Sequence, residues 1–249
     1  MIKVRLSRWH EQGYALIGSL VLLLLWLLIS LQIPDGFFQQ FRLDATLHTL
    51  WNLVLQSETY VHLWASLKRV AVGLIWALLL GLPLGLCIGQ NAVAEALSSQ
   101  VFQFLRMISP LSWMPIAVMV FGIGDQPIYF LLAFAALWPI MLNTATGVKQ
   151  VDPQLLKLAQ SLDANASEVF RYIIWPSILS QILVGLRLAI GIVWIVLVPC
   201  EMLGVHSGLG YFILDARDRL NYTELLSIVI IIGLIGYLLD RGVLMLQRH

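Results

Sequence analysis

Long apolar stretches separated by polar segments dominate the chain. A transmembrane helix needs about 20 mostly apolar residues. Six stretches meet or approach this length: 14–31, 70–89, 101–124, 127–148, 178–203 and 225–239. Basic residues precede the first stretch, as they do in a signal peptide, but no small-residue cleavage site follows it. The pattern predicts an all-α polytopic membrane protein, with six transmembrane helices in a single domain over 1–249.

Basic residues in the connecting segments predict the orientation, because cytoplasmic loops carry an excess of Lys and Arg. With both termini inside, the inner segments hold nine such residues: Lys3, Arg5, Arg8, Arg106, Lys149, Lys157, Arg171, Arg241 and Arg248. The outer segments hold five: Arg42, Lys68, Arg69, Arg217 and Arg219. We therefore expect 32–69 and 204–224 outside. The former is predicted to contain an interfacial helix, because Leu47, Leu50, Trp51 and Val54 recur at helical spacing.

The inner segment 152–176 predicts a helix–turn–helix. Asp152 followed by Pro153 is typical of a helix start. Asn165 and Glu168 have the spacing of a capping box for a second short helix, which we expect Pro176 to end. Each helix has an apolar side, formed by Leu155, Ala159 and Leu162 in the first and by Val169, Phe170, Ile173 and Ile174 in the second. From the pattern alone, this apolar face either meets a partner or lies on the membrane surface or on the protein's own helices.

Composition supports the membrane assignment. The chain has 249 residues, of which 59% are hydrophobic and 12% are charged, whereas soluble domains are about 25% charged. The net charge of +1 gives no field that attracts a polyanion. These values exclude a soluble enzyme, a disordered chain and a nucleic-acid binder.

Few residues suggest chemistry. Cys87 and Cys200 lie in apolar runs and are expected to be core residues, and the five histidines lack metal-ligand spacing. No Gly-x-x-x-x-Gly-Lys-[Ser/Thr] phosphate loop is present, so we expect no ATP hydrolysis and no cofactor. Gly81, Gly85 and Gly89, four residues apart, predict close helix packing.

Three ionisable residues lie inside predicted spans, where such groups usually face protein or water: Arg106, near the start of its span, and Arg187 and Glu201. Arg187 is a candidate contact for an anion, although it could equally snorkel or pair with a neighbouring helix. Glu201 lies near the outer end of its span, where it either gates or braces the outer mouth or is an ordinary helix-end carboxylate. In the third span, Pro110 and Pro115 either free carbonyls to line a cavity or kink the helix for packing.

The inner segment resembles a motif of the permeases of ATP-binding-cassette importers, Glu-Ala-Ala, three residues, Gly, nine residues, Ile-x-Leu-Pro. Ala159, Ile173 and Pro176 match it at the correct offsets. Lys157, Leu158, Asp163 and Trp175 depart from it, and Asp163 replaces the turn glycine. Further segments are similar to one branch, the permeases for taurine, aliphatic sulfonates, nitrate and bicarbonate: 109–115, 121–124, 185–191 with Trp194, 201–203 and 207–211.

The resemblance implies a six-helix permease of the bacterial inner membrane that forms the pathway for a small anion. It implies a homodimer, two cytoplasmic ATPase subunits that bind ATP and Mg, and an extracytoplasmic solute-binding protein. It also implies coupling to the ATPase through Lys157, Leu158, Ala159, Leu162, Asp163, Ile173 and Pro176. The candidate pathway residues are Ser109, Trp113, Arg187 and Glu201. The alternatives are an ion-coupled secondary transporter, which would want paired carboxylates at mid-membrane, and an intramembrane enzyme, for which we find no convergent nucleophile or metal ligands.

Overall fold

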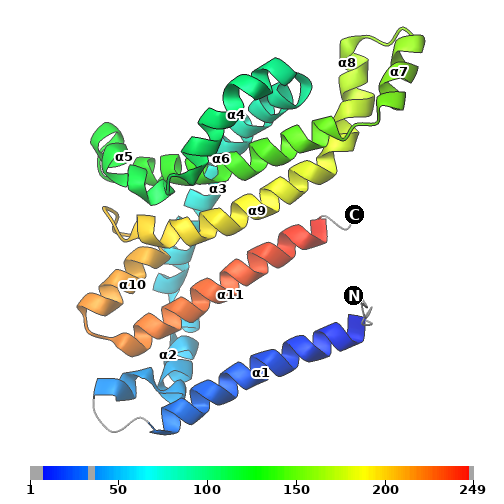
Figure 1. The fold of residues 1–249 in the computed structure, drawn as a ribbon. Helices are drawn as coiled ribbons and strands as arrows, with labels where there is room; N and C mark the ends of the chain where they lie inside the picture. The colour runs from blue at the N-terminus through cyan, green and yellow to red at the C-terminus, as the bar shows by residue number, and fades with distance from the viewer. Residues whose placement is uncertain (1–7, 33–36, 247–249) are drawn as a thin grey trace. The chain divides into compact units, whose positions relative to one another are not determined.

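The computed structural model describes residues 8–32 and 37–246, and every regular element among them is a helix. In order they are α1 (Arg8–Gln32), η1 (Phe37–Phe41), α2 (Leu43–Leu55), α3 (Ser57–Gln90), α4 (Ala92–Met107), η2 (Pro110–Trp113), α5 (Met114–Phe121), α6 (Asp125–Lys149), α7 (Pro153–Ser161), α8 (Ala166–Val169), the π-helix η3 (Phe170–Ile174), α9 (Trp175–Glu201), α10 (Leu209–Asp218) and α11 (Tyr222–Leu246) (Figure 1). The all-α prediction is confirmed.

The chain divides into two compact units, and the single transmembrane domain over 1–249 stays a prediction. One unit comprises Met1–Gln56 and Asp215–Ile231, and the other comprises Ser57–Leu214 and Ile232–His249. In the first unit, the beginning of α11 is tied to the N-terminal helices. The Ser227 hydroxyl donates to the Thr46 carbonyl at 3.0 Å, and the Tyr222 N–H donates to Gln40 Oε1 at 2.9 Å.

In the second unit, α3 packs on α6 through glycines. A Cβ added at Gly81 would lie 3.0 Å from Ile140 Cγ2, and one at Gly89 would lie 2.6 Å from Val148 Cβ. The expectation that Gly81, Gly85 and Gly89 allow close packing is therefore confirmed. Residues further along α3 contact residues further along α6, so the two helices run parallel.

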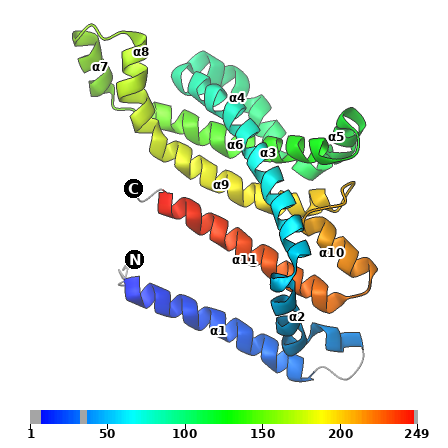
Figure 2. The same cartoon turned by 180° about the vertical axis from the view of Figure 1, so that it is seen from behind.

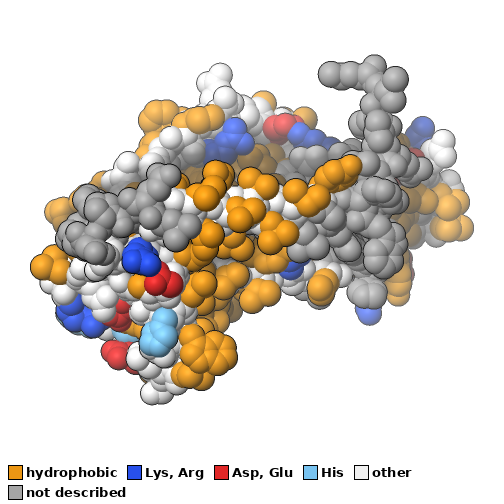
Figure 3. Space-filling model, turned by 90° about the horizontal axis from the view of Figure 1, so that it is seen from below, with side chains coloured by type: hydrophobic (Ala, Val, Ile, Leu, Met, Phe, Trp, Pro, Cys, Tyr) orange, Lys and Arg blue, Asp and Glu red, His pale blue; other side chains and the backbone are white. Residues whose placement is uncertain are grey.

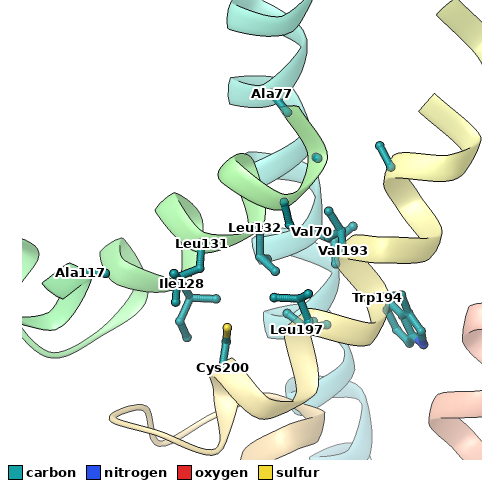
Figure 4. Packing of buried hydrophobic residues seen from close by; sticks show 14 of the residues in the cluster. Val70, Ala77, Ala117, Ile128, Leu131, Leu132, Val193, Trp194, Leu197 and Cys200 are labelled. Atoms are coloured by element: carbon teal, nitrogen blue, oxygen red, sulfur yellow. The ribbon is translucent and has the colours of Figure 1, made fainter. Parts of the chain in front are cut away.

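Helix α9 runs antiparallel to α6 and completes the core. Gly185 lies against Pro139 and Asn143, whereas Gly147 lies against Ile178 and Gln181. Figure 4 shows the side chains that meet between the three helices, with Val70 and Ala77 from α3, Leu131 and Leu132 from α6, and Val193 and Leu197 from α9. All six are at most 5% exposed.

The third predicted span is not one straight helix. It comprises α4 and, after a bend of 87°, the segment Pro110–Phe121. Since α3 and α6 both run across the membrane in the same direction, the chain between them must return once. The bent pair is therefore one broken crossing rather than a re-entrant loop, and Pro110, which lacks an N–H, begins its second part.

Helix lengths also differ from the predicted spans. Four helices of the described residues are long and apolar enough to cross a membrane, Ser57–Gln90, Asp125–Lys149, Ala166–Glu201 and Tyr222–Met245, and the bent pair makes five. The segment 57–69, which we expected in an outer loop, is the first third of α3. The expected helix in the same loop is present as α2, and the 204–224 loop contains α10. The first predicted span falls in α1, several of whose side chains lie outside the described residues, and its crossing stays a prediction.

Apolar side chains cover much of the surface, as the lipid phase of a membrane requires. Trp64 is 71% exposed and Ile195 is 75% exposed, and Figure 3 shows apolar side chains spread over the face in view. The same exposure in a water-soluble protein would mark a large interaction surface.

The inner segment forms a hairpin at the end of α6 and α9 opposite α5 (Figure 2). Helix α7 is its first arm, and α8 continues through η3 into α9 as its second. The expectation that Pro176 ends this second helix is wrong. The Trp175 N–H donates to the carbonyl of Phe170, five residues earlier, which is the hydrogen-bond pattern of a π-helix. Pro176 therefore lies where the regular α-helical hydrogen bonds are already interrupted, and the helix accommodates its ring and its missing N–H.

Candidate functional site

A buried ion network joins the first half of α3 to the beginning of α6 and the end of α9. Arg69 Nη1 donates to Glu201 Oε1 at 2.7 Å, and Arg69 Nη2 donates to Asp125 Oδ1 at 2.7 Å. Arg69 Nη1 also donates to the Ser207 carbonyl at 2.7 Å. The Arg69 and Glu201 side chains are 3% and 0% exposed, whereas that of Asp125 is 41% exposed. One guanidinium therefore holds a fixed carboxylate on one side and a solvent-accessible one on the other.

The Glu201 carboxylate has several further donors. The Ser66 hydroxyl lies 2.8 Å from both of its oxygens, and the Gly210 N–H donates to Oε2 at 2.9 Å. The loop before α10 approaches so closely that a Cβ at Gly208, where φ is +113°, would meet the Glu201 carboxylate and the Arg69 guanidinium. These donors hold the Glu201 side chain in place at the end of α9, and its expected role at the outer mouth stays a prediction.

Sequence reasoning missed Arg69, Asp125 and Ser66 because all three lie outside the predicted spans. The signal was in the pattern before position 70, where His62, Ser66 and Arg69 recur every three or four residues. This spacing places them on one helical face. His62 lies on the same face, and its Nδ1 accepts from the Gly208 N–H at 3.1 Å.

Arg187, the expected anion contact, is paired within the protomer. Its Nε and Nη2 donate to the two carboxylate oxygens of Asp240 on α11 at 2.7 and 3.1 Å. This bidentate geometry uses the donors that an anion would need. Contact between Arg187 and a transported anion stays a prediction, and it requires this pair to open.

Ser109 and Trp113 lie at the break between α4 and α5. Ser109 is exposed. The Trp113 indole N–H is buried and has no hydrogen-bond partner within the described part of the chain, and its ring lies 5.7 Å from that of Phe134. Trp113 packs against the apolar core to which α9 contributes, and no hydrogen bond among the described residues joins Ser109 or Trp113 to Arg187 or Glu201.

The caps expected for the hairpin are present. The Asp152 carboxylate accepts from the Gln154 N–H at 2.8 Å, and Asn165 and Glu168 form a reciprocal capping box. Asp163, at the turn-glycine position, adopts φ +49°. Ala164 N–H bonds to Ala159 O at 3.0 Å, which is the pattern of a Schellman turn.

The predicted coupling residues fall into two sets. Lys157, Leu158, Leu162, Asp163 and Pro176 are exposed, with Leu158 at 57% and Leu162 at 72%. Ala159 is only 5% exposed, and Ile173 packs on a small apolar cluster of Val148, Val151, Ile178 and Ile182. The protomer itself therefore covers Ala159, and the leucines are the apolar groups left bare.

The described residues contain no group of three or more His, Cys, Asp or Glu side chains that could hold a metal ion. The arrangement instead consists of ion pairs that join helices and a hairpin that offers apolar side chains to the surroundings. Ion pairs between helices and exposed apolar side chains fit a helical membrane protein that meets a partner.

Comparison with known proteins agrees with this interpretation. A family described as "binding-protein-dependent transport system inner membrane component" matches residues 77–249. The chain is 39% identical over 186 residues to the bicarbonate transport system permease protein CmpB of Synechococcus elongatus, covering 74% of this chain and 66% of that protein, just under two thirds of its length. It is 35% identical over 187 residues to the nitrate import permease protein NrtB of Synechocystis, covering 75% and 68%.

Two further comparisons extend the coverage. The chain is 32% identical over 222 residues to the taurine transport system permease protein TauC of Escherichia coli, covering 89% and 74%. A solved structure of the MetNI methionine ABC transporter, in an inward-facing conformation, shares the fold with a TM-score of 0.60 at 17% identity, covering 75% of this chain and 93% of that one. The chain belongs to the family of inner membrane components of binding-protein-dependent transport systems, the permease subunits of ATP-binding-cassette importers.

Proposed function

We propose that this permease forms the pathway of an importer for a small anion such as bicarbonate, nitrate or a sulfonate. The observation that carries the proposal is the set of similar permeases, which are named for bicarbonate, nitrate and taurine transport. Bicarbonate, nitrate and a sulfonate group share a single negative charge spread over a compact set of oxygens. Family membership argues against the alternative, an ion-coupled secondary transporter.

The working assembly is a pair of permeases in the bacterial inner membrane with two cytoplasmic ATPase subunits and an outer solute-binding protein. Both termini are cytoplasmic. Arg106, Lys68 and Arg69 lie within the crossing helices α4 and α3, and without them the bias of basic residues is eight inside to three outside. The ATPase binds ATP and Mg, and this chain holds no cofactor.

Coupling follows from the continuity of the hairpin with α9. Each ATPase grips the 152–176 hairpin through the exposed Leu158 and Leu162 with Lys157, Asp163 and Pro176, while Ala159 and Ile173 hold the hairpin's own shape. Because α8, η3 and α9 form one continuous helical segment, a displacement of the hairpin moves α9. That helix has 27 residues, about 40 Å at 1.5 Å per residue. The motion therefore reaches Glu201 and the Arg69 network at the opposite end.

The transport cycle alternates two states of the helices. ATP draws the ATPase subunits together, the pathway opens outward, and the docked binding protein releases its anion. Hydrolysis then restores the inward-facing state. Each ligand biases a two-state element by binding one state better than the other.

Uptake by the complete importer tests the proposal. The permease is co-expressed with its ATPase and binding protein, reconstituted in proteoliposomes, and supplied separately with labelled bicarbonate, nitrate and taurine. ATP-dependent accumulation of at least one is expected. Accumulation of none of the three by an importer that hydrolyses ATP would remove the anion assignment. Single-cysteine labelling from each side tests orientation, and a label at position 160 from outside only would reverse it.

A further inference from the structure

A polar stripe runs along α4, inside the broken crossing. Positions 95, 98, 99, 102, 103 and 106 have the spacing of one helical face, and they hold Glu95, Ser98, Ser99, Phe102, Gln103 and Arg106. Five of the six side chains are polar. A membrane helix with such a stripe does not turn it to lipid, because polar groups there lose their water without replacement.

The stripe lines a cavity of about 270 Å³ against α6. All six stripe residues border this cavity, together with α6 residues from Trp138 to Lys149. A single water needs about 10–15 Å³ of such space. The cavity therefore has room for a small anion together with several waters.

Arg106 lies at the deep end of the stripe, at the level of the middle of α6. It borders the cavity beside Trp138, which is 13 residues from the beginning of α6 and 11 from its end. Trp138 therefore lies about 20 Å from one end of α6 and about 16 Å from the other, measured along the helix. Because the hydrocarbon core of a membrane is about 30 Å thick, Trp138 lies near its midplane, and so does Arg106 on the same cavity wall.

The Arg106 guanidinium has no partner among the residues that the structure describes. Six cations of the described residues form ion pairs, namely Arg42, Arg69, Lys149, Arg187, Arg217 and Arg219. Arg106 forms no ion pair or hydrogen bond within the described part of the chain. The one carboxylate on the cavity wall, Glu95, binds Lys149 and is 11 residues away on α4, about 16 Å.

A second cavity, of about 350 Å³, meets the first at the same residue. It extends toward Pro110, Asn143 and Leu188, and it shares Arg106, Trp138 and Leu142 with the first. Arg106 is the charged residue on its wall. An unneutralised guanidinium between two open spaces at mid-membrane depth is a site for a small anion rather than for a cation or a neutral solute.

We propose that the polar stripe of α4 lines the inner half of the transport pathway, and that Arg106 is the residue that binds the passing oxoanion. The guanidinium offers paired N–H donors that match two oxygens of bicarbonate, nitrate or a sulfonate. This inference rests on the proposed function and adds to it the location and the contact. It also assigns the anion to an arginine that has no partner within 8–32 and 37–246, whereas Arg187 is already paired with Asp240.

Uptake by the reconstituted importer, with labelled bicarbonate, nitrate and taurine as separate probes, tests the role of Arg106. Arg106→Gln should lower uptake of whichever probe the wild type carries by about tenfold or more, since a charge-assisted contact is lost. ATP hydrolysis should continue, and Arg106→Lys should restore part of the uptake. Arg241→Gln, an exposed cation away from both cavities, is the matched control and should transport normally. Full uptake by Arg106→Gln would overturn the proposal.

Cysteine labelling tests the stripe even where Arg106→Gln fails to assemble. In a Cys87→Ser background, Ser99→Cys is compared with Leu97→Cys, which lies on the other face of α4 and is 76% exposed. The buried Cys200 is retained. In nanodiscs, a membrane-impermeant sulfonated maleimide should label position 99 but not 97, and the transported anion should slow the reaction. Equal labelling, or none at position 99, would overturn the pathway assignment. A wild-type importer that carries none of the three anions would instead refute the proposed function.

Discussion

Arg69 Nη1 lies 2.7 Å from Glu201 Oε1, and the two side chains are 3% and 0% exposed. The pair joins the first half of α3 to the last residue of α9, 132 residues further along the chain. Removing one buried partner leaves the other charge without water and without a counter-ion. The loss of stability from such a change depends on how deeply the remaining charge is buried. Asp125 allows a comparison with Glu201, because the same guanidinium binds Asp125 at the surface.

Arg69→Ala should therefore lower the free energy of unfolding by about 3–5 kcal/mol. Asp125→Asn, at a carboxylate that is 41% exposed, should cost about 1 kcal/mol or less. Thermal unfolding in detergent, followed by fluorescence-detected size exclusion, measures both. The double variant Arg69→Met with Glu201→Leu should unfold at a higher temperature than Arg69→Ala, because no buried charge remains. Equal losses from Arg69→Ala and Asp125→Asn would show that burial does not determine the stability of this network.

The glycines of α3 predict a second stability difference. A Cβ at Gly85 would lie 2.6 Å from Thr144 Cβ and 2.5 Å from the Met141 carbonyl, so Gly85→Ala must push α3 away from α6. Overpacking of this kind costs about 1–3 kcal/mol. Gly191→Ala is the matched control, because nothing lies within 4 Å of its added Cβ. The same unfolding assay should show a lower midpoint for Gly85→Ala only, and an unchanged midpoint would refute the close-packing role.

The sequence was most informative where structure is local. Apolar length predicted the crossing helices, and the capping residues Asp152, Asn165 and Glu168 predicted where α7 and α8 begin. Their signals lie within a few residues of the structure they form.

Tertiary contacts explain what the sequence did not reveal. Lys68 and Arg69 resembled the polar boundary of a span, yet Glu201 and Asp125 neutralise Arg69 from distant parts of the chain. Pro110 and Pro115 indicated a disturbance of the third span, but neither predicts a bend of 87°. Pro176 looked like a helix end until the preceding π-helix showed how it is accommodated.

The turn of the hairpin gives a third prediction. Asp163 has φ +49°, a conformation that favours glycine and that Asp tolerates better than β-branched residues. Asp163→Gly should leave hairpin stability unchanged or slightly higher, whereas Asp163→Val should lower it by about 1–2 kcal/mol. Limited proteolysis between α7 and α8 in detergent measures the difference. Similar cleavage rates for Asp163→Val and wild type would contradict the strained turn.

The coupling surface gives the last prediction. The sequence placed Ala159 at the centre of the face that meets the ATPase, but Ala159 is 5% exposed and its neighbour Leu158 is 57% exposed. A charge at Ala159 would therefore disturb the hairpin itself, while one at Leu158 would disturb only a partner that covers it. If an ATPase groove encloses Leu158, then Leu158→Asp places an unpaired carboxylate in a desolvated interface, which weakens binding by about 3–5 kcal/mol.

The Leu158→Asp permease should insert, fold and unfold at the wild-type temperature, yet it should lose most of the co-purifying ATPase and its ATP-driven uptake. Gln160→Glu, an exposed polar position two residues further along α7, should be nearly silent in the same assays. Full assembly and full uptake by Leu158→Asp would mean that the ATPase grips another part of the protein, because a buried apolar contact cannot accept a bare charge without loss of affinity.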